Sequence, residues 1–184
     1  MLGLGQSLSN PSFSGEETFS YFKETIESGD GWDLFQENGS FTIDYNQDAP
    51  DSSTGWLKIT FGEAQVDFWA LGNSSIMNGS PRGVEAGVTA TIKHDVYLHS
   101  AALWGSNDEN DDDVISWSTF FANNPNTSDI SPDSAVTVTS IHTQTGNPTN
   151  TIQFRNGVTT NNYDLPLANA VLYIKNIDIQ VTYP

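Results

Sequence analysis

Residues 28–61 read SGDGWDLFQENGSFTIDYNQDAPDSSTGWLKITF, and this stretch predicts two short strands joined by turns. Phe41, Ile43 and Tyr45 alternate with polar residues, which is the period-2 pattern of a half-buried strand. The segment 56–61 alternates in the same way. Both turns carry a Gly-Trp pair, and glycine adopts positive φ at little cost. The stretch therefore predicts an antiparallel β fold.

The rest of the chain extends this pattern. Residues 18–26 fit either a strand, with Phe19 and Tyr21 on one face, or a short helix. The run 64–71 is expected to pair with 56–61 through a tight Gly62-Glu63 turn. Further strands are expected over residues 84–98, 114–121, 135–143, 151–155 and 170–183, whereas 122–134 is expected to be a polar loop. The predicted fold class is all-β: a jelly-roll β-sandwich of about nine strands.

An extended N-terminal arm is expected over residues 1–13, followed by one sandwich domain over 14–184. The arm interleaves Leu2, Leu4 and Leu8 with glycine and serine, and it has no strand or helix signal of its own. We expect it to lie in a groove of its own domain or of a neighbouring subunit, as an assembly arm.

Charge and composition exclude several classes of function. The chain has 6 Lys+Arg against 23 Asp+Glu, a net charge of -17, which argues against nucleic acid and anionic membranes as partners. It has no cysteine, so disulfides, thiolate metal sites and a cysteine nucleophile are excluded. The first ten residues lack the basic region and apolar core of a secretory signal, so none is expected.

One acidic loop is a candidate cation site. Residues 107–113 read NDENDDD, and Asp108, Asp111 and Asp113 are the oxygen donors that a hard cation such as Ca²⁺ prefers. The alternative is a solvated surface loop. No other cofactor is indicated.

The five tryptophans divide into two groups. Three lie in apolar runs and are expected in the core: Trp32, Trp56 and Trp69. Trp104 instead precedes the acidic loop, and with Tyr97 and Asn107 it forms a candidate glycan platform, in which the ring stacks on a sugar and polar groups bind its hydroxyls. Packing in the core is the alternative role for Trp104.

Nothing in the chain selects catalytic residues. It has no nucleophile elbow, P-loop, zincin motif or Gly-rich dinucleotide loop, and its three histidines have no acidic or cysteine partner at metal-ligand spacing. We therefore do not expect an enzyme.

The order Gly-Trp, strand, Ala-Pro loop and Leu-Lys-Ile-Thr strand resembles the galactose-binding-like jelly-roll carbohydrate-binding modules. The segment 172–179, LYIKNIDI, is similar to their closing strand. Lys175 stands where those modules usually have an acidic residue that helps to hold a structural calcium, so the resemblance does not extend to that site. It implies a β-sandwich and, as a function, glycan recognition through exposed aromatic rings.

The opening MLGLGQSL and the Asn/Ser/Thr/Asp-rich, cysteine-free body also resemble small virion structural proteins of tailed phages. This resemblance implies a non-enzymatic decoration or fibre subunit on the particle exterior, made in the host cytoplasm. Its partners would be other virion proteins and copies of itself, with a trimer as one possible oligomer. The sequence favours this function, with a carbohydrate-binding module as the alternative.

Overall fold

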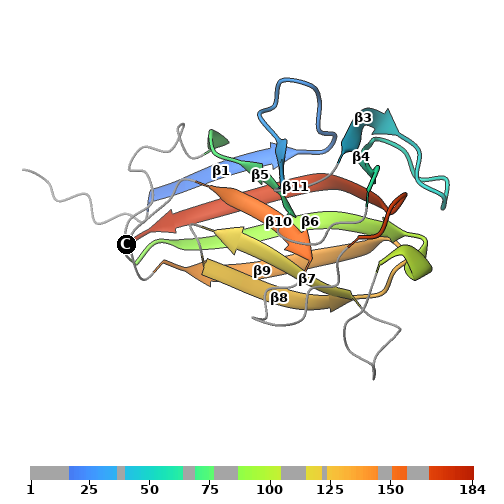
Figure 1. Cartoon of the computed structure of the whole chain (residues 1–184). Coiled ribbons are helices and arrows are strands. Elements are labelled where there is room, and N and C mark those ends of the chain that lie inside the picture. Colours follow the sequence, from blue (N-terminus) through green and yellow to red (C-terminus); the bar gives the residue numbers. More distant parts are fainter. Residues whose placement is uncertain are drawn as a thin grey trace, which may run out of the picture.

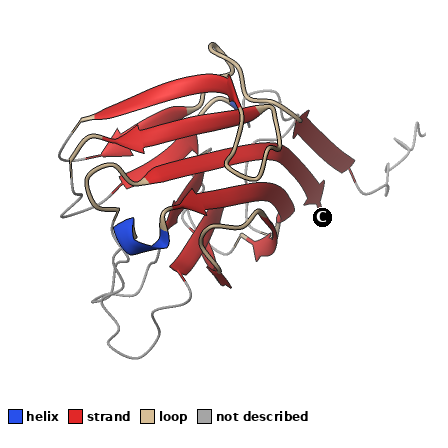
Figure 2. Ribbon diagram, turned by 90° about the vertical axis from the view of Figure 1, so that its right-hand side faces the viewer, coloured by secondary structure: helices blue, strands red, loops and turns tan. Residues whose placement is uncertain are grey.

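A computed structural model describes residues 17–36, 40–63, 69–76, 87–104, 115–121, 124–144, 151–156 and 166–184. This part of the chain forms β-strands and includes the short 3-10 helix Ala101–Leu103, the large blue turn in Figure 2. The strands are β1 Glu17–Lys23, β2 Asp33–Gln36, β3 Phe41–Gln47, β4 Trp56–Phe61, β5 Trp69–Asn73, β6 Thr89–His99, β7 Ile115–Phe121, β8 Asn124–Ile130, β9 Val136–Thr143, β10 Ile152–Asn156 and β11 Val171–Tyr183.

The strands form two stacked antiparallel sheets (Figure 1). The six-stranded sheet has the order β3-β4-β11-β6-β9, and β1 also pairs with β11. The five-stranded sheet has the order β2-β5-β10-β7-β8. The prediction of an all-β sandwich is confirmed, because sheets that face each other bury the apolar side of every alternating strand.

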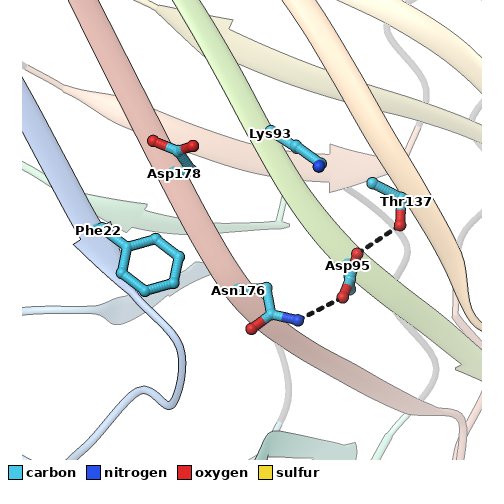
Figure 3. A pocket seen from close by; sticks show the side chains of 6 residues that line it. All are labelled: Phe22, Lys93, Asp95, Thr137, Asn176 and Asp178. Carbon is cyan, nitrogen blue, oxygen red and sulfur yellow. Dashed lines mark hydrogen bonds between the residues drawn. The ribbon is translucent and has the colours of Figure 1, made fainter.

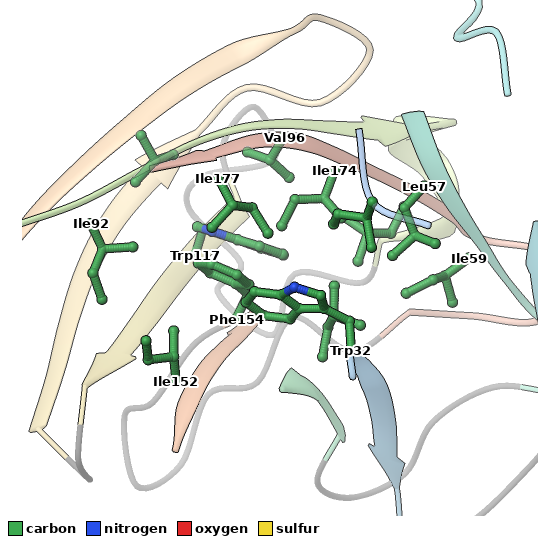
Figure 4. Close-up of a cluster of buried hydrophobic side chains, with 14 of the residues drawn as sticks. Trp32, Leu57, Ile59, Ile92, Val96, Trp117, Ile152, Phe154, Ile174 and Ile177 are labelled. Carbon is green, nitrogen blue, oxygen red and sulfur yellow. The ribbon is translucent and has the colours of Figure 1, made fainter. Parts of the chain in front are cut away.

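The core lies between the two sheets (Figure 4). The expected face of β6 and of the residue before it is buried: Val88, Ala90, Ile92, His94, Val96 and Leu98. Trp32 and Trp69 are also buried there, as the sequence predicts. The ring of Trp32 stacks on that of Phe154 with centroids 5.3 Å apart, which joins β10 to the residue just before β2. Aromatic rings therefore fill much of the space between the sheets.

Strand β11 is the centre of the six-stranded sheet, since it pairs with β1, β4 and β6. Its register against β6 shifts between Lys175 and Asp178, which is a β-bulge. Within the bulge Asn176 has φ of 53°, a left-handed conformation that asparagine tolerates well. The extra residue lets both Ile174 and Ile177 point into the core.

A second, smaller cluster covers one end of the outer face of this sheet. Trp56, Tyr97 and Tyr173 pack under the loop residue Ala49. Trp56 is thus buried as predicted, but it lies in this outer cluster and not between the sheets. The indole N–H of Trp56 donates to Ser53 Oγ at 2.8 Å, which fixes the loop to the sheet.

Lys175 fastens the same loop, and replacing it should destabilise the fold. Its ammonium donates to the carbonyl oxygen of Thr54 at 3.0 Å and lies 4.3 Å from the centre of the Trp56 ring. Lys175→Met keeps the aliphatic length but removes the charge, so we expect a loss of about 1 kcal/mol of unfolding free energy. Urea unfolding checks this, with the exposed Lys93→Met as control. Equal losses in the two variants would contradict the role of Lys175.

Three sequence expectations need correction or completion. Strand β5 does not pair with β4 but joins the opposite sheet between β2 and β10, because the chain crosses between the sheets after Gly62 and Glu63. The segment 124–130, expected to be a loop, forms strand β8 along β7. For residues 18–26 the strand alternative holds over β1, where Phe19 and Tyr21 pack against the core.

The predicted arm over residues 1–13, with Leu2, Leu4 and Leu8, lies outside the described residues, so the arm and the boundary at residue 14 stay predictions. In the described segments no helix is long and apolar enough to span a bilayer.

Candidate functional site

A shallow groove opens on the outer face of the six-stranded sheet, facing away from the core (Figure 3). Its volume is about 260 Å³. Residues from β1, β6, β9 and β11 line it: Phe22, Lys93, Asp95, Thr137, Asn176 and Asp178. We call it the Phe22 groove. Pockets that enclose a small molecule usually measure about 300–1,000 Å³, so this groove would cover only one side of a ligand.

Phe22 provides the apolar wall of the groove. Strand β1 alternates, and because Phe19 and Tyr21 face the core, Phe22 must face outward. Its side chain is 63% exposed, one of three large apolar residues left in solvent within the described residues. An aromatic ring presented to solvent beside polar groups is a feature of binding surfaces.

Asp95 is held in the groove by two side-chain hydrogen bonds. One carboxylate oxygen accepts a hydrogen bond from Thr137 Oγ1 at 2.6 Å, and the other accepts one from Asn176 Nδ2 at 2.6 Å (Figure 3). These donors come from the strands on either side of β6. They fix the rotamer of Asp95, so the carboxylate is oriented before any ligand arrives.

The bulge of β11 determines the positions of Asn176 and Asp178 in the groove. It places Asn176 beside Asp95. The next outward residue, Asp178, lies opposite Lys93 in the register of β11 and β6. Asn176 is held in turn by its own backbone N–H, which donates to the carbonyl of Glu24 at 2.9 Å. The groove thus has donors and acceptors at fixed positions around one exposed ring.

This arrangement is suited to binding a polar ligand. An exposed ring can stack on the C–H face of a sugar, and carboxylate, amide and ammonium groups can exchange hydrogen bonds with its hydroxyls. Asp95 and Asp178 lie on one open sheet face, so both carboxylates can be reached by a ligand from solvent.

Trp104 and Tyr97, two residues of the predicted glycan platform, do not line the Phe22 groove. Trp104 is 3% exposed, packs beside Phe61 and Trp69, and donates its indole N–H to the carbonyl of His99 at 3.1 Å. Tyr97 is 4% exposed within the outer cluster. Neither ring offers a face to solvent, and for Trp104 the burial supports the packing alternative. Asn107 lies outside the described residues.

The candidate cation loop, with Asp108, Asp111 and Asp113, also lies outside the described residues, so calcium binding stays a prediction. Among the residues that the structure does describe, no three His, Asp or Glu side chains gather in a way that would hold a metal ion.

The groove residues were not singled out in the sequence, although a signal was available. In the strand alternative for residues 18–26, Phe22 is out of phase with Phe19 and Tyr21, and an apolar residue on a solvent face suggests a function. The apolar face of β11 also changes parity between Ile174 and Ile177, which indicates a bulge.

The outer face of the five-stranded sheet carries a second aromatic group. Phe120 of β7 lies under the guanidinium of Arg155 of β10, 3.9 Å from the ring centre. Phe120 is buried, so its ring is already occupied by this cation–π contact.

No protein-family model matches the chain, and no curated protein matches it either. Solved structures do. The chain is similar to the CBM22-1–GH10 modules of endo-1,4-beta-D-xylanase 10B from Clostridium thermocellum, solved with xylohexaose, with a TM-score of 0.52 and 11% identity over 86% of this chain. The match covers 27% of that longer protein.

It is also similar to the C-terminal family 22 carbohydrate-binding module of Clostridium thermocellum Xyn10B, with a TM-score of 0.50 and 10% identity. That match covers 86% of this chain and 91% of the module. Likeness at this identity concerns the fold alone. The fold is that of the jelly-roll carbohydrate-binding modules, as the first of the two sequence resemblances implies.

Proposed function

We propose that this protein binds carbohydrate, without chemical change to it, and that the Phe22 groove is the binding site. The observation that carries the proposal is the exposed ring of Phe22 beside the pre-oriented carboxylate of Asp95. The fold shared with solved carbohydrate-binding modules supports it as well.

Four of the groove residues contact the sugar in the proposed complex. The ring of Phe22 stacks on one face of a sugar unit and removes apolar surface from water. Asp95 accepts hydrogen bonds from sugar hydroxyls with its remaining lone pairs, because its two existing donors leave part of its capacity unused. Lys93 donates to hydroxyl oxygens, and Asn176 accepts from hydroxyls through its amide oxygen.

Phe22→Ala tests the site directly. Losing the stacked ring should cost about 1.5–2 kcal/mol of binding free energy, which weakens affinity roughly 10- to 30-fold. Affinity electrophoresis against soluble xylan, mannan and mixed-linkage glucan identifies a ligand, and calorimetry with that ligand gives the dissociation constants. Thermal unfolding should change little, since Phe22 is mostly exposed.

Leu167→Ala is the matched control, because Leu167 is also exposed, at 42%, but lies outside the groove. It should bind as the unmodified protein does. A panel without any binding would overturn the function. Unchanged affinity in Phe22→Ala, together with weakened affinity in Arg155→Ala, would move the site to the five-stranded sheet.

The role on a phage particle, which the sequence favours, receives no support from the solved structures to which the chain is similar. It stays a prediction, together with the virion partners and the oligomer. Mass spectrometry of purified particles would test it. A glycan-binding fibre subunit would satisfy both interpretations.

A further inference from the structure

The Phe22 groove continues into an uncharged strip along the same sheet face. Two rows of outward side chains cross β1, β11, β6 and β9 on the side of the groove away from the outer cluster. One row is Ser20, Gln180, Thr91 and Ile141, and the next is Thr18, Thr182, Thr89 and Thr143. We call these two rows the polar strip.

The register makes the strip continuous with the groove. Phe22, Asp178, Lys93 and Thr139 form the row immediately before it, in line across the same four strands. From Asp95 to Thr89 the face extends about 20 Å along the strands, and about 14 Å across them. The side chains of the strip are exposed or half-exposed.

The composition of the strip is unusual for this chain. The protein has a net charge of -17, yet neither row contains Asp, Glu, Lys or Arg. Its side chains are hydroxyls, one amide and one aliphatic group. Such a surface exchanges hydrogen bonds with a neutral polyhydroxyl ligand without desolvating a charge. An anionic chain would instead be repelled by the acidic protein around it.

From this we infer that the ligand is an extended, uncharged polysaccharide chain, with one sugar unit in the Phe22 groove and neighbouring units along the polar strip. The inference rests on the proposed function and adds the ligand class and its length. A mono- or disaccharide would fill the groove alone and leave the strip in water.

Calorimetry with neutral oligosaccharides of two and six units tests the inference, using the xylo-, cello- and manno-series, with polygalacturonate as the anionic probe. We expect the six-unit member of one series to bind at least 10-fold more tightly than its two-unit member, and polygalacturonate not to bind. Gln180→Ala should weaken the six-unit ligand about 3- to 10-fold and leave the two-unit ligand unchanged.

Gln153→Ala is the matched control, since it removes the same side chain from β10 of the opposite sheet. Equal affinity for the two-unit and six-unit ligands would overturn this inference and leave the proposed function intact. Tighter binding of polygalacturonate than of the neutral ligands would have the same consequence. Weakening by Gln153→Ala but not by Gln180→Ala would also overturn it. If no probe binds, the proposed function itself fails.

Discussion

Replacing Asn73 by alanine should lower the free energy of unfolding by about 3 kcal/mol or more. Asn73 is fully buried at the end of β5, and its side chain makes four hydrogen bonds. Its amide nitrogen donates to the carbonyl of Asp30 at 2.8 Å. Its amide oxygen accepts from the backbone N–H of Ser75 and of Ile76, at 2.9 and 3.1 Å, and from the Ser75 hydroxyl.

The cost is large because alanine leaves these backbone groups without partners while they stay away from water. Urea unfolding at neutral pH measures it. Asn126→Ala is the control, since the Asn126 amide makes one long hydrogen bond, 3.3 Å, to the carbonyl of Ile141, and it should cost less than about 1 kcal/mol. Similar losses in the two variants would show that Asn73 does not organise this turn.

The protein should lose stability as the pH falls from 6.5 towards 3, because of a histidine inside the core. Burial lowers the pKa of His94 from its ordinary value of 6.5 to about 3. Its Nε2 accepts the indole N–H of Trp117 at 2.8 Å, so the ring is neutral with its proton on Nδ1. The ring also packs on Phe154, with centroids 4.3 Å apart.

The sign follows from which state binds the proton first. Below pH 6.5 the unfolded chain protonates this histidine while the folded protein does not, so each further pH unit favours unfolding by about 1.4 kcal/mol. Above pH 6.5 the group has no effect. Between pH 7.5 and 4.5 the loss should be about 2–3 kcal/mol.

His94→Gln isolates this contribution. Glutamine keeps an acceptor for Trp117 but does not titrate, so the variant should show a flatter pH dependence of unfolding free energy over the same range. The range is kept above pH 4.5 because the pKa of Asp133 is also shifted. Its partial burial alone would raise that pKa, but hydrogen bonds from the N–H groups of Ala101 and Ser100 and from His99 lower it overall. Parallel pH profiles for the two proteins would contradict the assignment to His94.

The sequence predicts the sheets better than the site because alternation reports burial directly. Along β4 and β6 every second residue faces the core, and all of these core-facing residues are buried. Which strands pair is a different question, because pairing depends on the path of the connection. The run that ends in β5 has the same pattern whether it folds back on β4 or crosses to the other sheet.

The candidate site was missed for a related reason. Trp104 has the features of a binding residue in sequence, since it stands alone beside an acidic loop, but its burial depends on Phe61 and Trp69 from distant strands. Phe22 has the features of a core residue, and only the choice of strand over helix sends it outward. The partners of Asp95 come from β9 and β11, which sequence spacing does not bring together.

Strand β11 also constrains the order in which the protein can fold. It follows β1, β4 and β6 in the chain, yet it is the neighbour to which all three bond. During synthesis these earlier strands leave the ribosome with unsatisfied edges, and they must wait for residues 171–183 to be translated. The nascent chain is therefore exposed to aggregation until β11 has emerged, and a premature stop codon before residue 171 would leave the six-stranded sheet in separate pieces.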